Sequence, residues 1–188
     1  MPLGKPFYER DPAAVARELL GRVLVVDREA ECSGAIVETE AYYGLSDPAS
    51  RAARGKTRLS RWMWEDAGTS FVYMVHGHWL FNVITERKGK PSGVLIRAVE
   101  PREGVEEMRR RRQTDRETNL TSGPGKLTRA LGITGRDNGI AVYLPRSSIR
   151  IEEGERAENV ATSHRIGVRS DLPEHLRFFI PGNPFVSR

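Results

Sequence analysis

In the first part of the chain, the pattern of hydrophobic and polar positions predicts a helix followed by two strands. Asp11 followed by Pro12 predicts a helix start, because aspartate accepts the free N–H groups of a first turn and proline fits its first position. The predicted helix continues to Gly21. Four consecutive apolar residues then predict a strand over 22–28 that is buried on both faces, with the segment around Ile36 as its hairpin partner.

The middle of the chain carries the clearest strand patterns. Segments 69–76 and 78–86 are rich in aromatic and β-branched residues and flank Gly77, so we expect two strands joined by a tight turn. A further strand is expected over 93–99. The stretch 43–68 has little strand character and is interpreted as a long loop rich in basic and aromatic residues, and such loops are usually functional.

In the remainder of the chain, the sequence pattern predicts two helices and four short strands. One helix is expected over 103–113, and the other begins at 122–125 and ends at Gly132. The short strands are expected near 141–144, 149–152, 165–168 and 177–180. This order is too irregular for a parallel βαβ fold. The sequence therefore predicts the α+β class, with residues 1–188 forming a single compact domain of a mainly antiparallel curved β-sheet and surrounding helices.

Composition adds an expectation about partner and compartment. The chain has 188 residues, of which 30 are Lys or Arg and 25 are Asp or Glu, so its net charge of +5 favours a polyanionic partner such as nucleic acid. Cys32 is the only cysteine, which excludes intrachain disulfides and a thiolate zinc site. Because neither a signal peptide nor an apolar membrane span is evident, we expect a cytoplasmic protein. We also expect a monomer.

The segment from Gly34 to Tyr42 holds the most informative candidate chemistry. Successive side chains on a strand point to opposite faces, so Glu38, Glu40 and Tyr42 share one face of this predicted strand. A carboxylate beside an aromatic ring could activate water against a flat, stacked substrate. The alternative interpretation is an edge strand whose acidic face is solvated.

Other common chemistries lack their sequence patterns. The chain has no phosphate-binding glycine loop and no nucleophile elbow, and His76 and His78 are too close in sequence for a paired-histidine metal site. We expect no metal and no other cofactor. Arg97 lies inside an apolar strand, where a buried arginine needs a partner.

Six short segments, spread over most of the chain, carry a family resemblance. They are Glu38-Thr39-Glu40-Ala41-Tyr42; Asp47-Pro48-Ala49-Ser50 with Arg54-Gly55-Lys56-Thr57; Val72-Tyr73 with Gly77 and Asn82-Val83; Leu95-Ile96-Arg97-Ala98-Val99-Glu100-Pro101; Ser122-Gly123-Pro124 with Lys126-Leu127; and Pro181-Gly182-Asn183-Pro184. In this order they resemble the alkyladenine (3-methyladenine) DNA glycosylases of the single-domain mixed α/β type. The resemblance runs from about residue 6 to residue 187.

The resemblance implies a monofunctional base-excision repair enzyme that binds double-stranded DNA, flips out a damaged purine and hydrolyses its N-glycosidic bond. Alkylated purines are the implied substrates, with deaminated purines as a further expectation. Glu40 matches the general base, and Arg97 matches the arginine that positions the attacking water. Tyr42 and Tyr73 match the rings that hold the flipped base, and Asn82 matches the residue that crowds the guanine amino group.

Two of the departures from the family pattern fall on candidate site residues. Arg51 stands where a histidine usually contacts the edge of the flipped base, and an arginine is longer and only donates hydrogen bonds. His76 stands where a tyrosine usually wedges into the duplex. Lys56, Arg61 and Lys126 flank the matched segments and are the expected contacts to the DNA backbone.

Two further functions remain open at this point. The departures at Arg51 and His76 would suit a protein that binds damaged DNA without cutting the glycosidic bond. A metal-dependent nuclease would have to use Glu38, Glu40 and Asp47, whose spacing is poor for metal ligands. The run 109–112 invites a DNA-binding interpretation, but nearby glutamates favour a salt-bridged helix face.

Overall fold

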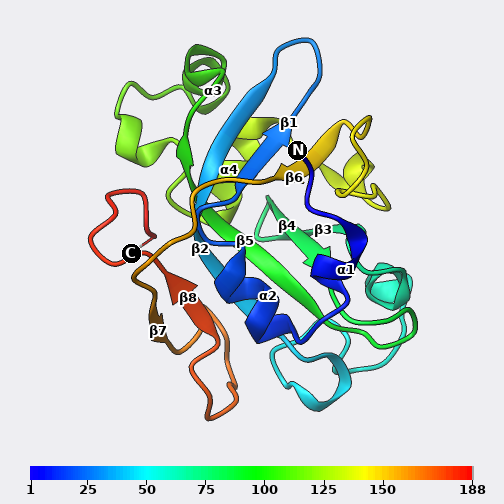
Figure 1. The fold of residues 1–188 in the computed structure, drawn as a ribbon. Coiled ribbons are helices and arrows are strands. Elements are labelled where there is room, and N and C mark those ends of the chain that lie inside the picture. The colour runs from blue at the N-terminus through cyan, green and yellow to red at the C-terminus, as the bar shows by residue number, and fades with distance from the viewer. Residues whose placement is uncertain (188) are drawn as a thin grey trace.

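One antiparallel sheet organises the protein. Its strands are β1 (Val23–Val26), β2 (Cys32–Tyr42), β3 (Ser70–Val75), β4 (His78–Ile84), β5 (Gly93–Pro101), β6 (Ile149–Glu152), β7 (Ala161–Ser163) and β8 (Arg177–Phe179). The computed structural model describes residues 1–187 and places these strands in the order β3-β4-β5-β2-β1-β6, with β8 beside β2 and β7 beside β8. Figure 1 shows the curl of this sheet, and the predicted α+β fold is confirmed.

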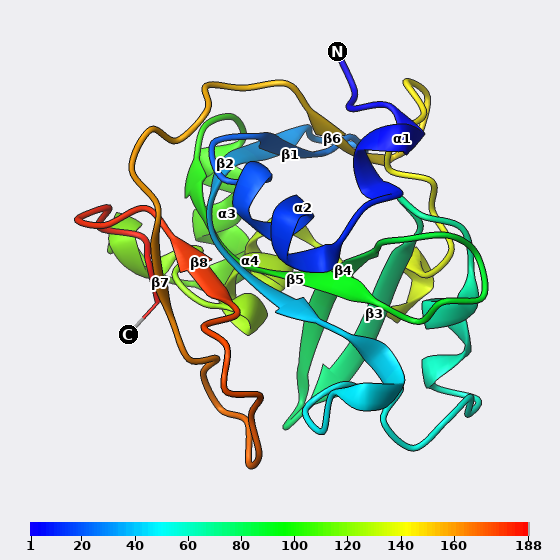
Figure 2. The same ribbon diagram turned by 60° about the horizontal axis from the view of Figure 1, so that its bottom comes forward.

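Short helices cover the sheet. They are α1 (Lys5–Tyr8), α2 (Pro12–Glu18), α3 (Val105–Arg112) and α4 (Pro124–Leu131), with 3-10 helices η1 (Gly44–Ser46), η2 (Ser60–Trp64), η3 (Glu117–Asn119) and η4 (Gly135–Asp137). The predicted cap of α2 is confirmed, because the Asp11 carboxylate accepts the N–H groups of Ala13 and Ala14 at 2.9 and 3.1 Å. Helix α2 lies across β2 and β5, inside the curl of the sheet (Figure 2).

The two faces of the sheet have different roles. Phe81, Val94 and Ile96 point into the main core, where they pack with apolar residues of α2 and α4. On this face the Thr39 hydroxyl donates a 2.8 Å hydrogen bond to the Ala16 carbonyl oxygen of α2. Side chains that alternate with these along β2, β4 and β5 point to the opposite face, and the candidate site lies there.

Two of the predicted short strands are wrong. Segment 141–144 is a turn, in which Ala141 makes an isolated bridge to Thr69. Segment 165–168 is irregular, and the strand in this region is β7, a few residues earlier. Both predictions relied on local alternation of apolar residues, whereas strand pairing depends on a neighbour that is distant in sequence.

The long loop predicted over 43–68 is largely confirmed, since η1 and η2 are its only helical turns. Among residues 1–187, no helix has both the length and the apolar character that crossing a membrane would require.

Candidate functional site

Two carboxylates lie at the centre of the sheet. Glu38 and Glu40 are on β2, which has β5 along one side and β1 followed by β8 along the other. Both side chains are 0% exposed. The interpretation of this segment as an edge strand with a solvated acidic face is therefore wrong, because β2 is enclosed by strands on both sides. The predicted sharing of one face is confirmed by Arg97, which contacts both carboxylates.

A local irregularity aims Arg97 at these carboxylates. The pairing of β2 with β5 shifts register on both sides of Glu38, which leaves Val37 on β2 and Arg97 on β5 as extra residues. Extra residues of this kind re-aim side chains next to many active sites. The Arg97 Nε lies 2.9 Å from Glu38, and its Nη1 lies 3.2 Å from Glu40. The expectation that a buried arginine here needs a partner is confirmed.

The Glu38 carboxylate accepts hydrogen bonds from several neighbouring groups. Besides Arg97, it accepts a 2.7 Å hydrogen bond from Arg177 Nε of β8. The backbone N–H and the hydroxyl of Ser187 donate to it at 2.7 and 2.8 Å. A carboxylate with this many donors has little capacity left for a substrate, so Glu38 fixes the position of Arg97 and of β8.

Glu40 has fewer partners and faces the aromatic side of the site. Its carboxylate accepts a 2.8 Å hydrogen bond from the Tyr42 hydroxyl and another of 2.8 Å from the Ile166 backbone N–H. Burial raises the pKa of Glu40, and the opposing effects of Arg97 and of these hydrogen bonds only limit the rise. Sequence alone left these effects unranked; in the structure burial is the largest. A carboxylate with a raised pKa is a stronger base when ionised.

An aromatic slot begins beside Glu40. Its lining includes Tyr42, Tyr73, Phe71, Asn82 and Arg51, and its volume is about 10 Å³. The Phe71 and Tyr73 rings stack with centroids 5.0 Å apart, and the Arg51 guanidinium lies 4.6 Å from the Tyr73 centroid. Tyr73 is thus both a packed residue and a wall of the slot. A volume of this size holds about one water molecule. With Arg51 in this position, the slot is therefore too small for a larger ligand.

The Asn82 amide has a defined orientation. Its Nδ2 donates hydrogen bonds to the Phe71 and Leu80 carbonyl oxygens at 3.1 and 3.3 Å. Both amide hydrogens are therefore used, and the group left for a ligand is the amide oxygen, which can only accept.

Asp47 belongs to an ion pair and not to a metal site. It is 0% exposed and accepts two hydrogen bonds from Arg165, at 2.6 and 2.8 Å. Over residues 1–187, no group of three His, Cys, Asp or Glu side chains is arranged to hold a metal ion. The nuclease interpretation, which needs Glu38, Glu40 and Asp47 together, is therefore not supported by the geometry.

The predicted wedge residue lies at the tip of the β3–β4 hairpin. His76 and Gly77 form its two-residue turn, and both have positive φ, 48° and 79°. A type I′ turn requires this, and histidine tolerates it better than most side chains. His76 is exposed. The start of α4 packs beside this hairpin, since a Cβ at Gly125 would lie 2.7 Å from the His78 Cβ.

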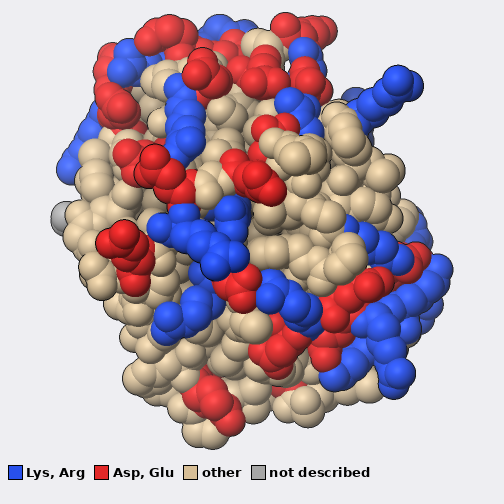
Figure 3. All heavy atoms as spheres, in the orientation of Figure 1, with Lys and Arg blue, Asp and Glu red and all other residues tan. Residues whose placement is uncertain are grey.

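The predicted backbone contacts lie on two segments. Lys56 and Arg61 are exposed on the long loop, where they lie 5.9 and 5.1 Å from the ring centroids of Trp64 and Trp62. Lys126 is half-buried near the start of α4, and burial, together with nearby arginines, lowers its pKa. On the face shown in Figure 3, basic and acidic side chains are interspersed.

Three of the four arginines of the run on α3 form salt bridges within their own helix. Arg109 bonds to Glu106, and Arg110 and Arg111 bond to Glu107. The salt-bridged interpretation is confirmed for these three, whereas Arg112 donates to the Leu120 and Asn119 carbonyl oxygens at 3.0 and 3.1 Å.

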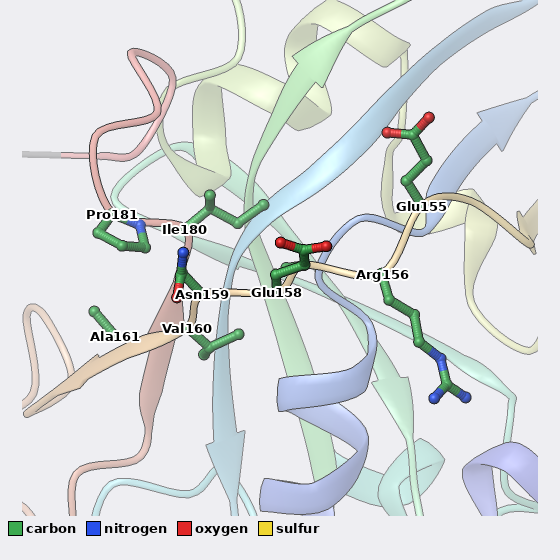
Figure 4. A pocket seen from close by; sticks show the side chains of 9 residues that line it. Glu155, Arg156, Glu158, Asn159, Val160, Ala161, Ile180 and Pro181 are labelled. Atoms are coloured by element: carbon green, nitrogen blue, oxygen red, sulfur yellow. The ribbon is translucent and has the colours of Figure 1, made fainter.

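A broader hollow of about 780 Å³ lies elsewhere, along residues 155–161 and the turn after β8. Its charged side chains point in different directions in Figure 4, so they do not converge on one ligand. It is also separate from the residues of the slot.

Four contributors to the site escaped the sequence reasoning: Arg165, Ile166, Arg177 and Ser187. All come from the last part of the chain, where the sequence offers only one weak indication. Several charged residues there alternate with apolar ones, and a charge within a buried segment needs a partner.

Comparisons with known proteins agree on one family. A sequence model of the family described as methylpurine-DNA glycosylase (MPG) matches residues 6–184. A protein of Oceanobacillus iheyensis is 43% identical over 197 residues, covering 100% of this chain and 96% of that protein. One of Methanoculleus marisnigri is 42% identical with 100% of both covered, and one of Aeropyrum pernix is 41% identical with 99% and 93% covered. Each bears the name "Putative 3-methyladenine DNA glycosylase".

Proposed function

Since the chain belongs to the methylpurine-DNA glycosylase family and is a DNA glycosylase for alkylated bases, we propose that it hydrolyses the N-glycosidic bond of a flipped purine with water activated by Glu40. One observation carries this proposal. Glu40 is a fully buried carboxylate that lies 3.2 Å from Arg97 and 2.8 Å from the Tyr42 hydroxyl, at the edge of an aromatic slot.

In the proposed reaction a water oxygen bonds to C1′ of the sugar while the bond from C1′ to the purine nitrogen breaks. The electron pair of that bond goes to the base, and a positively charged alkylpurine leaves as a neutral molecule. Glu40 takes one proton from the water, so the sugar ends with a hydroxyl at C1′ and the strand remains uncut. No covalent enzyme intermediate is needed, which supports a monofunctional enzyme.

Arg97 has two tasks in this proposal. Its positive charge favours the ionised form of Glu40, which burial opposes. Its guanidinium also presents donors beside the carboxylate, where they can orient the attacking water.

The flipped base is proposed to stack between Tyr42 and Tyr73. A ring attracts a cation by about 0.5–2 kcal/mol, which suits alkylated purines that carry charge. The slot is too small for a purine while Arg51 lies over Tyr73, so entry requires this exposed side chain to swing away. The proposed exclusion of normal guanine by Asn82 is steric, through crowding of the amino group, because the free amide oxygen of Asn82 is an acceptor and does not repel an amino donor.

The DNA backbone is proposed to contact Lys56, Arg61 and Lys126, with His76 filling the gap that the flipped nucleotide leaves. We expect Lys56→Ala to weaken binding equally on all sequences. The negative slope of log affinity against log salt should become shallower by about 1, because one phosphate contact is lost. Fluorescence anisotropy over a salt series measures both effects.

Lys5→Ala is the matched control for this prediction. Lys5 is a lysine of α1 that pairs with Asp66 at 2.8 Å, so its loss should leave the salt slope unchanged. Equal slopes for Lys56→Ala and the parent protein would remove Lys56 from the interface.

The experiment that tests the proposed function is a panel of duplexes, each with one lesion, scored by release of free base. We expect release from alkylated purines in the presence of a strong chelator, with strands intact until alkali is added. Tight lesion binding without release would instead support the damage-binding alternative. Strand cleavage that the chelator abolishes would support a nuclease.

A further inference from the structure

The loop between β7 and β8 closes over the candidate site. It extends to the same side of the sheet as the segment that follows β2, as Figure 2 shows, and the buried Arg165 joins the two. The Arg165 side chain is 0% exposed, although the next residue, Ile166, is 38% exposed. A buried guanidinium under an otherwise exposed loop indicates that this residue holds the loop in place.

The contacts of Arg165 are more numerous than a simple ion pair requires. It donates two hydrogen bonds to Asp47, at 2.6 and 2.8 Å, and one to the Ala41 carbonyl oxygen at 3.0 Å. On its other side, Nε donates to Asp171 at 2.8 Å, and the Arg165 backbone N–H reaches the same carboxylate at 3.1 Å. Asp171 also accepts the Leu172 N–H at 2.9 Å, so its carboxylate connects Arg165, at the start of the loop, to the middle of the loop.

Arg165 with its partners Asp47, Ala41 and Asp171, called the clamp below, contacts the surroundings of Glu40 at two places. The residue after Arg165 donates its backbone N–H to the Glu40 carboxylate at 2.8 Å. The Arg165 guanidinium also lies 4.5 Å from the centroid of the Tyr42 ring, and the Tyr42 hydroxyl donates to the other oxygen of Glu40. The Arg165 side chain therefore supports both uncharged groups that donate hydrogen bonds to Glu40, the Tyr42 hydroxyl and the Ile166 amide.

We propose that Arg165 is a positioning residue for the glycosylase reaction, which fixes the Ile166 amide and the Tyr42 ring against the Glu40 carboxylate. The inference rests on the proposed function of Glu40. An arginine is required because its planar fork bonds to two carboxylates and a carbonyl oxygen while its face stacks on a ring. A lysine keeps the charge but has neither the fork nor the flat face.

The effect on Glu40 has a definite direction. The charged and titratable groups around it are Arg97 from β5, Glu38 and Tyr42 from β2, Tyr73 from β3, and Arg177 from β8, which is the strand partner of Glu40. The Ile166 amide from the loop lowers the pKa of Glu40, so its displacement raises that pKa. A base with a higher pKa becomes protonated at higher pH, and excision is lost earlier as the pH falls.

A histidine pair lies close to the clamp. His164 Nδ1 is 3.6 Å from Asp171, and the His164 and His175 rings are 4.6 Å apart. Because a rate profile reports every ionisable group near the site together, the Glu40 carboxyl has to be observed directly.

The test compares Arg165→Lys with Arg22→Lys. Arg22 is also a buried arginine, and it bonds to carbonyl oxygens of Glu18 and Gly154, outside the site. We expect single-turnover excision by Arg165→Lys to fall on the order of 10²-fold, the effect of a misplaced reacting group. Carbon-13 NMR of the free protein should show the Glu40 carboxyl titrating at higher pH than in the parent. Arg22→Lys should match the parent in both measurements.

Two different failures can be told apart. If the parent protein releases no base, or if Glu40→Gln is as fast as the parent, the proposed function is wrong. If Glu40 is essential but Arg165→Lys leaves its titration unchanged or lowers it, the positioning role is overturned. That role is equally overturned if the excision rate of Arg165→Lys falls only in proportion to the folded fraction measured by circular dichroism.

Discussion

Replacing Glu40 with glutamine should reduce single-turnover excision of an alkylated purine by about 10²–10⁴-fold, the usual contribution of a general base. Glutamine has nearly the same shape, and its amide oxygen can still accept a hydrogen bond from Tyr42 or from the Ile166 amide. It cannot take a proton from water at neutral pH. The loss should therefore appear in the rate of base release, while affinity for lesion-containing DNA stays within a few-fold of the parent value.

A carboxylate outside the site provides the control for this prediction. Glu100 is exposed on β5 and accepts a 2.7 Å hydrogen bond from Asn183, so Glu100→Gln should excise at the parent rate. Excision by Glu40→Gln as fast as by the parent would rule out the assigned mechanism.

Replacing Arg97 with methionine should lower the free energy of unfolding by about 3–5 kcal/mol, because removing one partner of a buried ion pair leaves an uncompensated charge. Glu38 keeps Arg177 as a partner, whereas Glu40 loses its only charged contact among residues 1–187. Urea or thermal unfolding followed by circular dichroism measures the loss. Excision should also fall at neutral pH, because the loss of Arg97 raises the pKa of Glu40 further and leaves a smaller fraction of this carboxyl ionised.

The pH dependence of this loss has a predicted sign. Without Arg97 the pKa of Glu40 rises further, so the folded state keeps a proton that the unfolded state releases. A group whose pKa is raised in the folded state contributes stability at low pH, and this stability is lost as the pH increases. Arg97→Met should therefore lose stability more steeply than the parent as the pH rises above the ordinary pKa of glutamate, about 4.3.

A double variant separates the charge effect from simple loss of packing. Glu40→Gln added to Arg97→Met removes the uncompensated carboxylate and should recover part of the stability. No recovery would show that lost packing around the arginine stem dominates. A parent-like midpoint for Arg97→Met alone would contradict the buried ion pair.

The features that sequence predicted are those that local rules determine. The β3–β4 hairpin followed from β-branched and aromatic residues on each side of Gly77, and the start of α2 followed from Asp11 and Pro12. The shared face of Glu38 and Glu40 followed from the period of a strand. Each depends on residues that are neighbours in sequence, so each could be predicted without knowing the fold.

The features that sequence did not predict depend on distant partners. The register shifts that aim Arg97 arise only when β2 and β5 pair, and no local pattern marks them. The segment 165–168 alternates like a strand, yet Arg165 is held by Asp47, which is 118 positions away. The proposed roles of Arg51 and His76 came from family resemblance, because an arginine in a loop and a histidine in a turn are uninformative alone.

The hydrogen bonds from Ser187 to Glu38 have a consequence for the folding of the protein. These two residues are 149 positions apart, so their contact forms only when a loop of that length is closed, which costs conformational entropy. Until Ser187 docks, a buried negative charge lacks two of its donors, which costs free energy. Completion of the reactive centre therefore requires the C-terminal segment to dock, because Ser187 supplies two of the donors that hold Glu38 beside Arg97.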